Sequence, residues 1–452
     1  MDLLFLPPYF FLLYFFAVQI RNKYPDNFLI QKYFVKGLVI KMVGAIFFAL
    51  LAQYYYGYGD TLSYYRESLL MREAVAQNKI SILEIFTSDY EFVKEKYDWV
   101  AGSTEAGYFV EKIGFILTYF SFSRFLLTAC LITGLTYFGI FKLFQVFVSI
   151  IPDKHKIISY FVLFFPSLVI YGSGIFKDPI CFSALGWLFY CTYQVMLRKK
   201  ITLLNIFILI CSFWVILLVK SYIIAAFMVP LSFSLAIKSL KNVKSVLIKI
   251  IVFPILILSL IGTYIIFSAD IDEMLGEFAL EKLAESIQGQ QKGYAAQEAD
   301  AGSNFQLGEL DPTMAGVAKQ LPIGMIVTFY RPYIWEVRKP IIAATAFESL
   351  FILLFTLYTL FKVGIFRFFK FIFTDSDVFL CMIFALLFGG LVGISTLNFG
   401  TLTRYRIPVI PFYLFGILLI LQKGLAAKAL KKDKISKNVQ TEPEPLHILT
   451  LG

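Results

Sequence analysis

The sequence predicts an all-α, polytopic membrane helical bundle of about eleven transmembrane helices with two large outer loops, on three observations. First, 59% of the 452 residues are hydrophobic and 16% are charged, whereas globular domains carry about 25% charged residues. Second, apolar runs of about 20 residues recur from the first residues to Gln422. Third, Lys and Arg gather in the short polar gaps between these runs. A bilayer is therefore the expected solvent of this chain.

Each predicted span is an apolar run between polar gaps. The first run, MDLLFLPPYFFLLYFF, lacks a basic n-region and a small-residue cleavage site, so we interpret it as a retained span rather than a signal peptide. The apolar stretch 108–122 is short and charged near its start, and we interpret it as an interfacial or re-entrant helix. The predicted spans are 4–20, 37–56, 123–148, 157–174, 179–197, 202–219, 221–238, 246–267, 341–365, 377–396 and 407–422.

The gaps between spans also predict the orientation. Every second gap is basic, which the positive-inside rule assigns to the cytoplasm, and an odd number of spans then places the N-terminus outside and the C-terminus inside. We expect an integral protein of a bacterial inner (plasma) membrane. The net charge of +10 does not indicate nucleic acid, because it lies in these gaps. The basic residues are Arg21, Lys23, Lys32 and Lys36; Lys154 and Lys156; Arg198, Lys199 and Lys200; Lys238, Lys241, Lys244 and Lys249; Arg367 and Lys370; and Lys423, Lys428, Lys431, Lys432 and Lys434.

This topology divides the chain into an integral membrane domain, 1–434, and a polar cytoplasmic tail, 435–452, expected to be disordered. Two long segments, 57–107 and 268–340, are the outer loops. The second is acidic, and we predict a helix from Asp270 to Ser286, a Gly/Ala/Gln-rich stretch, and a return to the membrane. Its middle, Gly289 to Gly302, motivates the hypothesis that 268–320 is a mobile lid.

Polar residues at the predicted outer boundary fall into five short clusters. Charged side chains at membrane depth are costly and commonly mark functional paths, so these clusters are the candidate site. The predicted topology places all five on one side of the membrane. They are 59–66, 172–178, Lys220 with Tyr222, 329–336 and 398–406.

The chemistry of these side chains suggests transfer to or from a phosphate-bearing substrate. Asp60 is the candidate catalytic residue, since a carboxylate beside an acceptor hydroxyl accepts its proton. Arg and Lys bind phosphate, Arg with a bidentate fork. Aromatic side chains offer flat faces to sugar rings. The candidate substrate-binding residues are Arg66, Glu67, Lys177, Asp178, Lys220, Arg331, Trp335, Glu336, Arg404 and Arg406.

Structural roles compete with these functional ones. Aromatic residues at a membrane boundary are usually interface residues, and the two arginines of 404–406 would serve equally as interface anchors. Lys177 and Asp178 would form a local ion pair, and Asp60 directly after a span would be a turn residue. Glu348 within a span must be paired or functional.

Histidine and cysteine offer little chemistry. His155 lies in a basic inner gap and His447 in the tail, which excludes a His-based mechanism on the outer face. The five cysteines lie in apolar runs without a CxxC pair. No metal is required, although Asp60 with Glu67 could hold a divalent ion weakly.

The segments YGYGDTLSYY, 106–143 with Arg124, and FFPSLVIYGSGIFKDP are similar to parts of the GT-C superfamily, the membrane glycosyltransferases that use polyprenyl-phosphate-linked sugars. That resemblance implies an acidic catalytic residue in the first outer loop, here Asp60. TFYRPYIWE and GTLTRYRIPVIPF look like segments of Wzy-like polysaccharide polymerases. Two features depart from the family pattern. The family usually has an acidic pair at this place, and here Asp60 is alone unless Glu67 is the second member. The soluble C-terminal outer domain that oligosaccharyltransferases carry is also not expected here.

The resemblance and the clusters together lead to the hypothesis of an outer-face glycosyltransferase or polymerase in cell-surface polysaccharide synthesis. Its expected partners are a lipid-linked sugar donor, a glycan acceptor and membrane lipids. A transporter or flippase of a lipid-linked or anionic substrate is the first rival, and it predicts midplane charges and broken helices. The spans hold few such charges, chiefly Lys41, Lys142 and Glu348. A scaffold that binds partners through loop 268–320 is the second rival.

Overall fold

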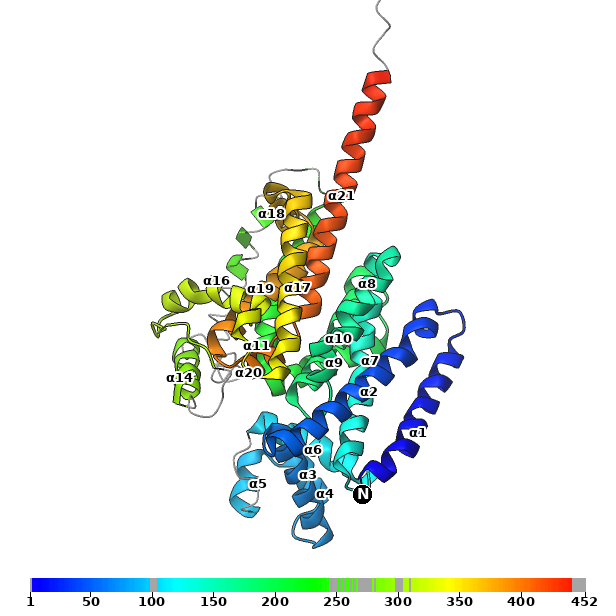
Figure 1. Cartoon of the computed structure of the whole chain (residues 1–452), viewed down its shortest axis with the longest axis vertical. Coiled ribbons are helices and arrows are strands. Elements are labelled where there is room, and N and C mark those ends of the chain that lie inside the picture. The colour runs from blue at the N-terminus through cyan, green and yellow to red at the C-terminus, as the bar shows by residue number, and fades with distance from the viewer. Residues whose placement is uncertain are drawn as a thin grey trace, which may run out of the picture.

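Figure 1 shows the computed structural model of the chain, in which long helices pack side by side into a bundle. The structure describes residues 2–97, 104–241, 282–296, 304–308 and 310–440, and isolated residues between 243 and 279. Within these residues every named element is helical, and the single β-bridge joins Asn304 to Asn398. The predicted all-α class is therefore confirmed.

Seven helices in the described part are long and apolar enough to cross a membrane, fewer than the eleven predicted spans. They indicate an integral membrane protein. They are Leu4–Lys23, Ile30–Tyr56, Phe125–Ile150, Leu203–Leu240, Pro340–Val363, Ser376–Ser395 and Ile410–Leu430.

The difference between eleven predicted spans and these seven helices has several sources. The predicted span 157–174 is broken at Phe165, which separates α8 and η4 from α9, whereas 179–197 is a continuous helical run through α10 and η5 that is not among the seven. The predicted spans 202–219 and 221–238 meet at a kink at Lys220 within α11, which counts as a single span, and more than half of 246–267 lies outside the described residues. The helices concerned are α8 (His155–Ser159), η4 (Tyr160–Phe164), α9 (Pro166–Ile170), α10 (Lys177–Thr192), η5 (Tyr193–Leu197) and α11 (Leu203–Leu240).

Helix α11 has a bend where the sequence predicts a turn between two spans. Its 38 residues would measure about 57 Å if straight, roughly twice the thickness of the hydrocarbon core. Lys220, at φ −150° and ψ 72°, is the one residue inside α11 with non-helical angles. The bend therefore sets the position of Lys220 within the bundle.

The two ends of the bundle differ in what they carry. The turn between α1 and α2, helix α8 and helix α18 lie towards the upper end in Figure 1, whereas α3, α4, α5 and α6 lie at the lower end. The upper elements flank gaps that the sequence predicts to be cytoplasmic. The bounds are α1 (Asp2–Lys23), α2 (Val35–Leu50), α3 (Asp60–Ala76), α4 (Ile82–Thr87), α5 (Tyr90–Tyr97), α6 (Glu105–Phe120) and α18 (Ile365–Thr374).

The stretch predicted to be interfacial or re-entrant forms α6, a helix of 16 residues that packs on α3. A tight turn separates it from α7 (Phe125–Ile150), because Phe122 and Ser123 both adopt positive φ. Helix α6 is thus distinct from the long span that follows it, and its place in the interface stays a prediction.

Helices in the bundle approach closely at glycines, as is common in membranes. A Cβ atom at Gly139 of α7 would lie 2.1 Å from the carbonyl oxygen of Ser183 in α10. A Cβ atom at Gly393 of α19 would lie 2.0 Å from the carbonyl oxygen of Gly324 in α16. The bounds of the latter pair are α16 (Met314–Tyr330) and α19 (Ser376–Ser395).

The segment 268–340, predicted to be the second outer loop, is partly helical where a flexible stretch was expected. Helix α14 (Leu283–Ala296) extends through half of the Gly/Ala/Gln-rich region, and Gln291 donates to the carbonyl oxygen of Ile394 at 2.7 Å. Most of the predicted helix Asp270–Ser286 lies outside the described residues. The described part of the proposed lid therefore includes a helix docked on α19.

The C-terminal helix passes the predicted start of the tail. Helix α21 (Ile410–Gln440) continues six residues beyond Lys434, and 441–452 lie outside the described residues. The remaining elements are η1 (Ile30–Phe34), η2 (Leu51–Tyr56), η3 (Pro152–Lys154), η7 (Ile334–Glu336), α17 (Pro340–Val363) and α20 (Phe399–Tyr405).

Candidate functional site

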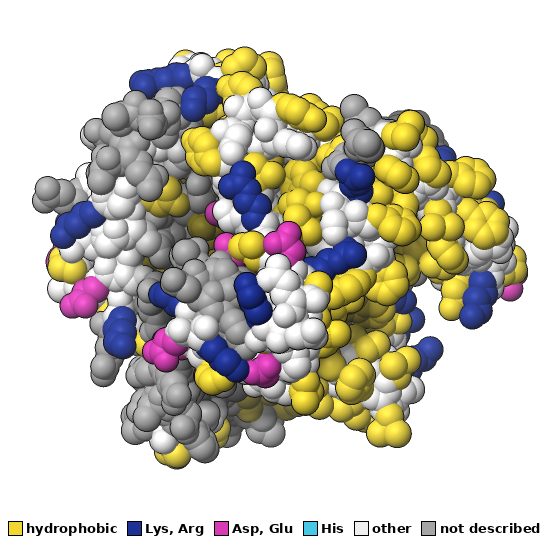
Figure 2. Space-filling view, turned by 90° about the horizontal axis from the view of Figure 1, so that it is seen from below, with side chains coloured by type: hydrophobic (Ala, Val, Ile, Leu, Met, Phe, Trp, Pro, Cys, Tyr) yellow, Lys and Arg dark blue, Asp and Glu magenta, His cyan; other side chains and the backbone are white. Residues whose placement is uncertain are grey.

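A polar cavity of about 680 Å³ lies between α3, α10, α11, α14, α19 and α20. Figure 2 views the α3 end of the molecule, where acidic and basic side chains gather beside a broad apolar surface. Residues far apart in sequence meet in this cavity. Its walls are formed by Asp60, Thr104, Ala106, Lys177, Val219, Lys220, Tyr222, Leu283, Ile287, Gln290, Gly293, Tyr294, Leu391, Val392, Ser395, Thr401, Arg404 and Tyr405.

Two glycines place Asp60 at the start of α3. Gly57 ends the preceding helix at φ 72° and Gly59 precedes α3 at φ 119°, angles that side chains with a Cβ rarely adopt. Asp60 follows as the first residue of the helix, where the N-terminal end of the dipole favours a carboxylate. Its side chain is 50% exposed. The GYGD sequence thus turns the chain sharply and presents Asp60 at the cavity wall.

The short helix α20 places Arg404 opposite Asp60. The Asn398 side chain caps this helix by accepting from the backbone N–H groups of Gly400 and Thr401. Arg404 Nη2 then lies 2.8 Å from Asp60 Oδ2, although 344 positions separate the two residues. Burial alone would lower the pKa of Arg404, but the nearby carboxylates of Asp178 and Asp60 raise it, so this guanidinium is a permanent cation.

Asp178 pairs with two cations of the cavity wall, Lys220 and Arg404, without lining the cavity itself. It belongs to the first turn of α10, is 1% exposed, and accepts from Lys220 at the bend of α11. Its other oxygen, Oδ2, lies 3.4 Å from Arg404 Nη2. Asp178 is not a wall residue of the cavity, so its geometry is that of a positioning residue for Lys220 and Arg404.

The charged cluster carries one excess positive charge, since the three cations Lys177, Lys220 and Arg404 face the two carboxylates Asp60 and Asp178. Half-buried Lys177 donates to the Thr104 hydroxyl at 3.1 Å. The Tyr405 ring lies 4.3 Å from Lys220 Nζ and provides an aromatic wall. A cavity with this balance suits an anionic group with an attached polar ring, such as a sugar phosphate.

Arg406 lies in a different, fully buried cluster. It is 0% exposed and donates to the carbonyl oxygens of Thr328 and Arg331, to Ser349 Oγ at 3.0 Å, and to Glu348 at 3.4 Å. Glu348 also accepts from the backbone N–H of Ser167, at the start of α9. We define these interactions of Arg406 and Glu348 as the buried arginine cluster. They leave Arg406 no access to the polar cavity.

Arg331 and Glu336, both predicted to bind substrate, pair with each other. Arg331 Nε lies 3.0 and 3.1 Å from the two Glu336 carboxylate oxygens. The guanidinium packs 4.5 Å from the Phe305 ring centroid. Trp335 stacks on Tyr333 and is 81% exposed. None of these residues lines the polar cavity.

The remaining predicted residues lie along α3. Arg66 is exposed and Glu67 is half-buried, and neither lines the polar cavity. Burial raises the pKa of Glu67, one of whose oxygens has no hydrogen-bond partner among the described residues. Within the residues that the structure describes, no group of three His, Cys, Asp or Glu side chains is arranged to hold a metal ion.

Helix α14 supplies a cavity wall that the sequence analysis did not predict. Gln290, Gly293 and Tyr294 line the cavity from this helix. Thr401 and Tyr405, from within the 398–406 cluster, were likewise not singled out as ligands. An aromatic residue in a Gly/Gln-rich outer segment was the available signal for Tyr294, and it is weak by itself.

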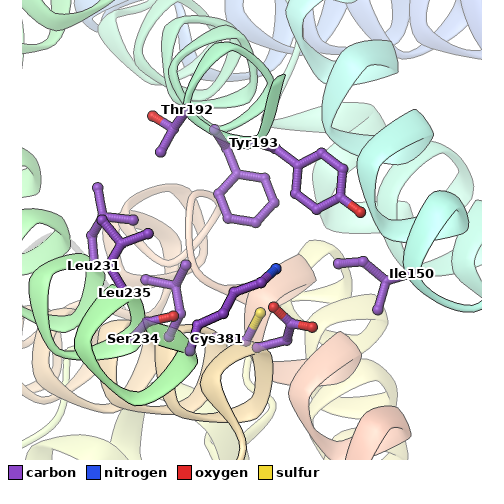
Figure 3. A pocket seen from close by; sticks show the side chains of 11 residues that line it. Ile150, Thr192, Tyr193, Leu231, Ser234, Leu235 and Cys381 are labelled. Atoms are coloured by element: carbon purple, nitrogen blue, oxygen red, sulfur yellow. The ribbon is translucent and has the colours of Figure 1, made fainter. Parts of the chain in front are cut away.

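Two other hollows differ in size and position. A cavity of about 20 Å³, shown in Figure 3, lies between the far ends of α7, α10 and α11 and includes Ile150, Thr192 and Leu235 in its wall; it has room for about one water molecule. A mostly apolar groove of about 380 Å³ lies between α2, η2, α9 and α17 and includes Phe47 and Glu348. Of these three hollows in the described part of the chain, the polar cavity is the one with both the size and the charges for a sugar phosphate.

No protein family, curated protein or solved structure matches the chain.

Proposed function

We propose that this protein is a membrane glycosyltransferase or polymerase that uses polyprenyl-(pyro)phosphate-linked sugars in cell-surface polysaccharide synthesis. The observation that supports it is the polar cavity, where Asp60, Lys177, Lys220 and Arg404 converge from four separate helices. A carboxylate and several cations around one cavity are the groups that transfer from a phosphate-linked donor needs.

The proposed reaction is an inverting displacement at the anomeric carbon. The acceptor hydroxyl oxygen forms the new bond to that carbon, and Asp60 takes the hydroxyl proton. The bond from the anomeric carbon to the phosphate oxygen breaks, and its electron pair stays on the departing lipid phosphate. Arg404, Lys177 and Lys220 stabilise this growing negative charge. Preorganised charges of this kind contribute several kcal/mol to catalysis, about 3 kcal/mol for one donor.

The apolar groove offers a place for the lipid part of such a donor. Phe47, Leu51 and Ile170 line it, and its lining is mostly apolar. A prenyl chain there would be surrounded by side chains as apolar as itself.

The test is glycan synthesis in cells that carry Asp60→Asn, Lys177→Ala or Arg404→Ala as their only copy. We expect each variant to insert normally and to lose polymer, or to accumulate a short lipid-linked unit, which would also distinguish polymerisation from addition of one sugar. Glu73→Gln, an exposed carboxylate on α3, is the matched control for Asp60, and Arg367→Ala, exposed on α18, is the control for Arg404. Normal glycan in all three cavity variants would refute the proposal.

A transporter of a lipid-linked or anionic substrate is the second candidate, because the segment 155–170 is broken as transporter helices are. The two buried charges beside the break bind backbone, however. Lys41 donates to the carbonyl oxygens of Leu168 and Gly172, and Glu348 accepts from the N–H of Ser167. Uptake or flipping of a labelled polyprenyl phosphate by vesicles, without new glycan, would favour this candidate.

A further inference from the structure

One nitrogen of Arg404 contacts both cavity carboxylates. Nη2 lies 2.8 Å from Asp60 and 3.4 Å from Asp178, whereas Nε is buried and has no hydrogen-bond partner in the described part of the chain. The guanidinium therefore retains a donor that neither carboxylate uses. Because Nε is enclosed, an incoming phosphate would meet this planar group at Nη2, where half-exposed Asp60 now binds.

The two carboxylates differ in how firmly they are held. Asp178 is buried, so water cannot take the place of Arg404 beside it, and separating the two is costly even though Lys220 remains as a partner. Asp60 is half exposed at the first turn of α3, and water replaces Arg404 there at little cost. An incoming anion would displace Asp60 rather than Asp178.

We propose that Arg404 exchanges Asp60 for the phosphate of the donor, and that this exchange releases Asp60 to act as the base. The inference rests on the proposed function and adds an order of events to it. Without the donor, Arg404 holds the Asp60 carboxylate. The bound phosphate takes that position on Arg404, and the freed carboxylate faces the acceptor hydroxyl. Donor binding thus precedes activation of the acceptor.

The exchange predicts competition between Asp60 and anions for Arg404. Purified full-length protein in detergent is titrated with a polyprenyl monophosphate and, separately, with inorganic pyrophosphate. We expect Asp60→Asn to bind both roughly fivefold more tightly than the wild type, the size expected for loss of one half-exposed ion pair. The same variant should lose transfer activity, which separates binding from catalysis.

A double variant tests whether the gain in anion affinity depends on Arg404. In the Arg404→Ala background, Asp60→Asn should give no further gain, because the competing cation is absent. Glu73→Gln removes a carboxylate from the same helix and should leave binding unchanged, which controls for a general change in net charge. Asp60→Ser serves as a second variant if Asp60→Asn does not give monodisperse protein.

Each outcome counts for or against the exchange. Unchanged or weaker anion binding in Asp60→Asn, or an equal gain in the Arg404→Ala background, overturns it. Tighter pyrophosphate binding through Arg404 with no binding of polyprenyl phosphate supports the exchange and removes the proposed donor class. Failure of every variant to bind either anion overturns both proposals. Loss of transfer in Asp60→Asn with unchanged affinity supports the proposed function without the exchange.

Discussion

Arg404 and Arg406 are two positions apart, yet the structure places them in different environments. Arg404 is 20% exposed, lines the polar cavity and pairs with Asp60. Arg406 is 0% exposed and lies in the buried arginine cluster with Glu348. Residues two apart on a helix point to nearly opposite sides, because each residue turns the helix by about 100°. One face of the TRYR segment is therefore available for substrate and the other is used to hold the fold.

The two clusters also differ in what satisfies their charges. The buried arginine cluster pairs Arg406 with Glu348 and with backbone carbonyl oxygens, so it has no excess charge. The polar cavity has three cations against two carboxylates, and part of it is open to solvent. An arginine near a membrane boundary is thus a candidate ligand only when its neighbours leave charge unpaired. The following variants test this difference, from the largest expected effect to the smallest.

The largest loss of stability is expected for Arg406→Ala. Removal of one member of a buried ion pair leaves the other charge buried without its partner, which typically costs about 3–5 kcal/mol. The measurement is thermal unfolding of the protein in detergent, followed by intrinsic fluorescence. The double variant Arg406→Met with Glu348→Leu should be more stable than Arg406→Ala, because it buries no charge. An unchanged melting temperature in Arg406→Ala would contradict the buried arginine cluster.

Asp178→Asn should have an intermediate effect on stability and a large one on function. Lys220 loses its buried counter-charge, for an expected cost of about 1–3 kcal/mol. Transfer should also fall, since Lys220 and Arg404 lose the carboxylate that positions them. The measurements are the melting temperature and transfer in membranes supplied with lipid-linked sugar. Asp178→Glu keeps the charge and should recover part of the activity, whereas equal losses in both variants would indicate a purely steric role.

Arg404→Ala should reduce transfer activity strongly while lowering the stability of the protein less than Arg406→Ala does. Its pair with half-exposed Asp60 contributes at most about 1 kcal/mol, and Asp178 keeps its buried partner Lys220, so the melting temperature should fall less than in Arg406→Ala. Transfer should fall roughly 100-fold or more, as when an electrostatic donor is removed from an active site. Arg404→Lys keeps the charge without the fork and should retain intermediate activity. A variant that unfolds as Arg406→Ala does would remove the distinction between the two arginines.

The smallest effect is expected at Trp335. Its side chain is 81% exposed and stacks only on one face, against Tyr333, so Trp335→Ala should change the free energy of unfolding by less than about 0.5 kcal/mol. Chemical or thermal unfolding measures the change. A fall in transfer activity without a fall in stability would identify Trp335 as a substrate contact, as the sequence analysis predicted.

The distribution of apolar and charged residues determined the class of this protein. A chain with so few charges must bury its apolar runs in a bilayer, and within a bilayer backbone groups must bond inside helices. Fewer helices qualify as spans than were predicted, in part because periodicity does not reveal the break before Pro166. The predicted turn at Lys220 is a bend within α11, and more than half of the predicted span 246–267 lies outside the described residues. Helix α14 was missed because its packing on α19 overrides the low helix propensity of its glycines.

The sequence also identified the charged residues at one end of the helices as candidates, because charged side chains are rare and costly at the boundary of an apolar span. The sequence did not show which of them meet in one cavity, namely Asp60, Lys177, Lys220 and Arg404. Nor did it show that Arg331 and Arg406 pair with carboxylates outside that cavity. Composition and periodicity are local properties of the chain, so they identify helices and the solvent around them. Which charges meet depends on contacts between residues hundreds of positions apart, and only the packing of the helices decides those.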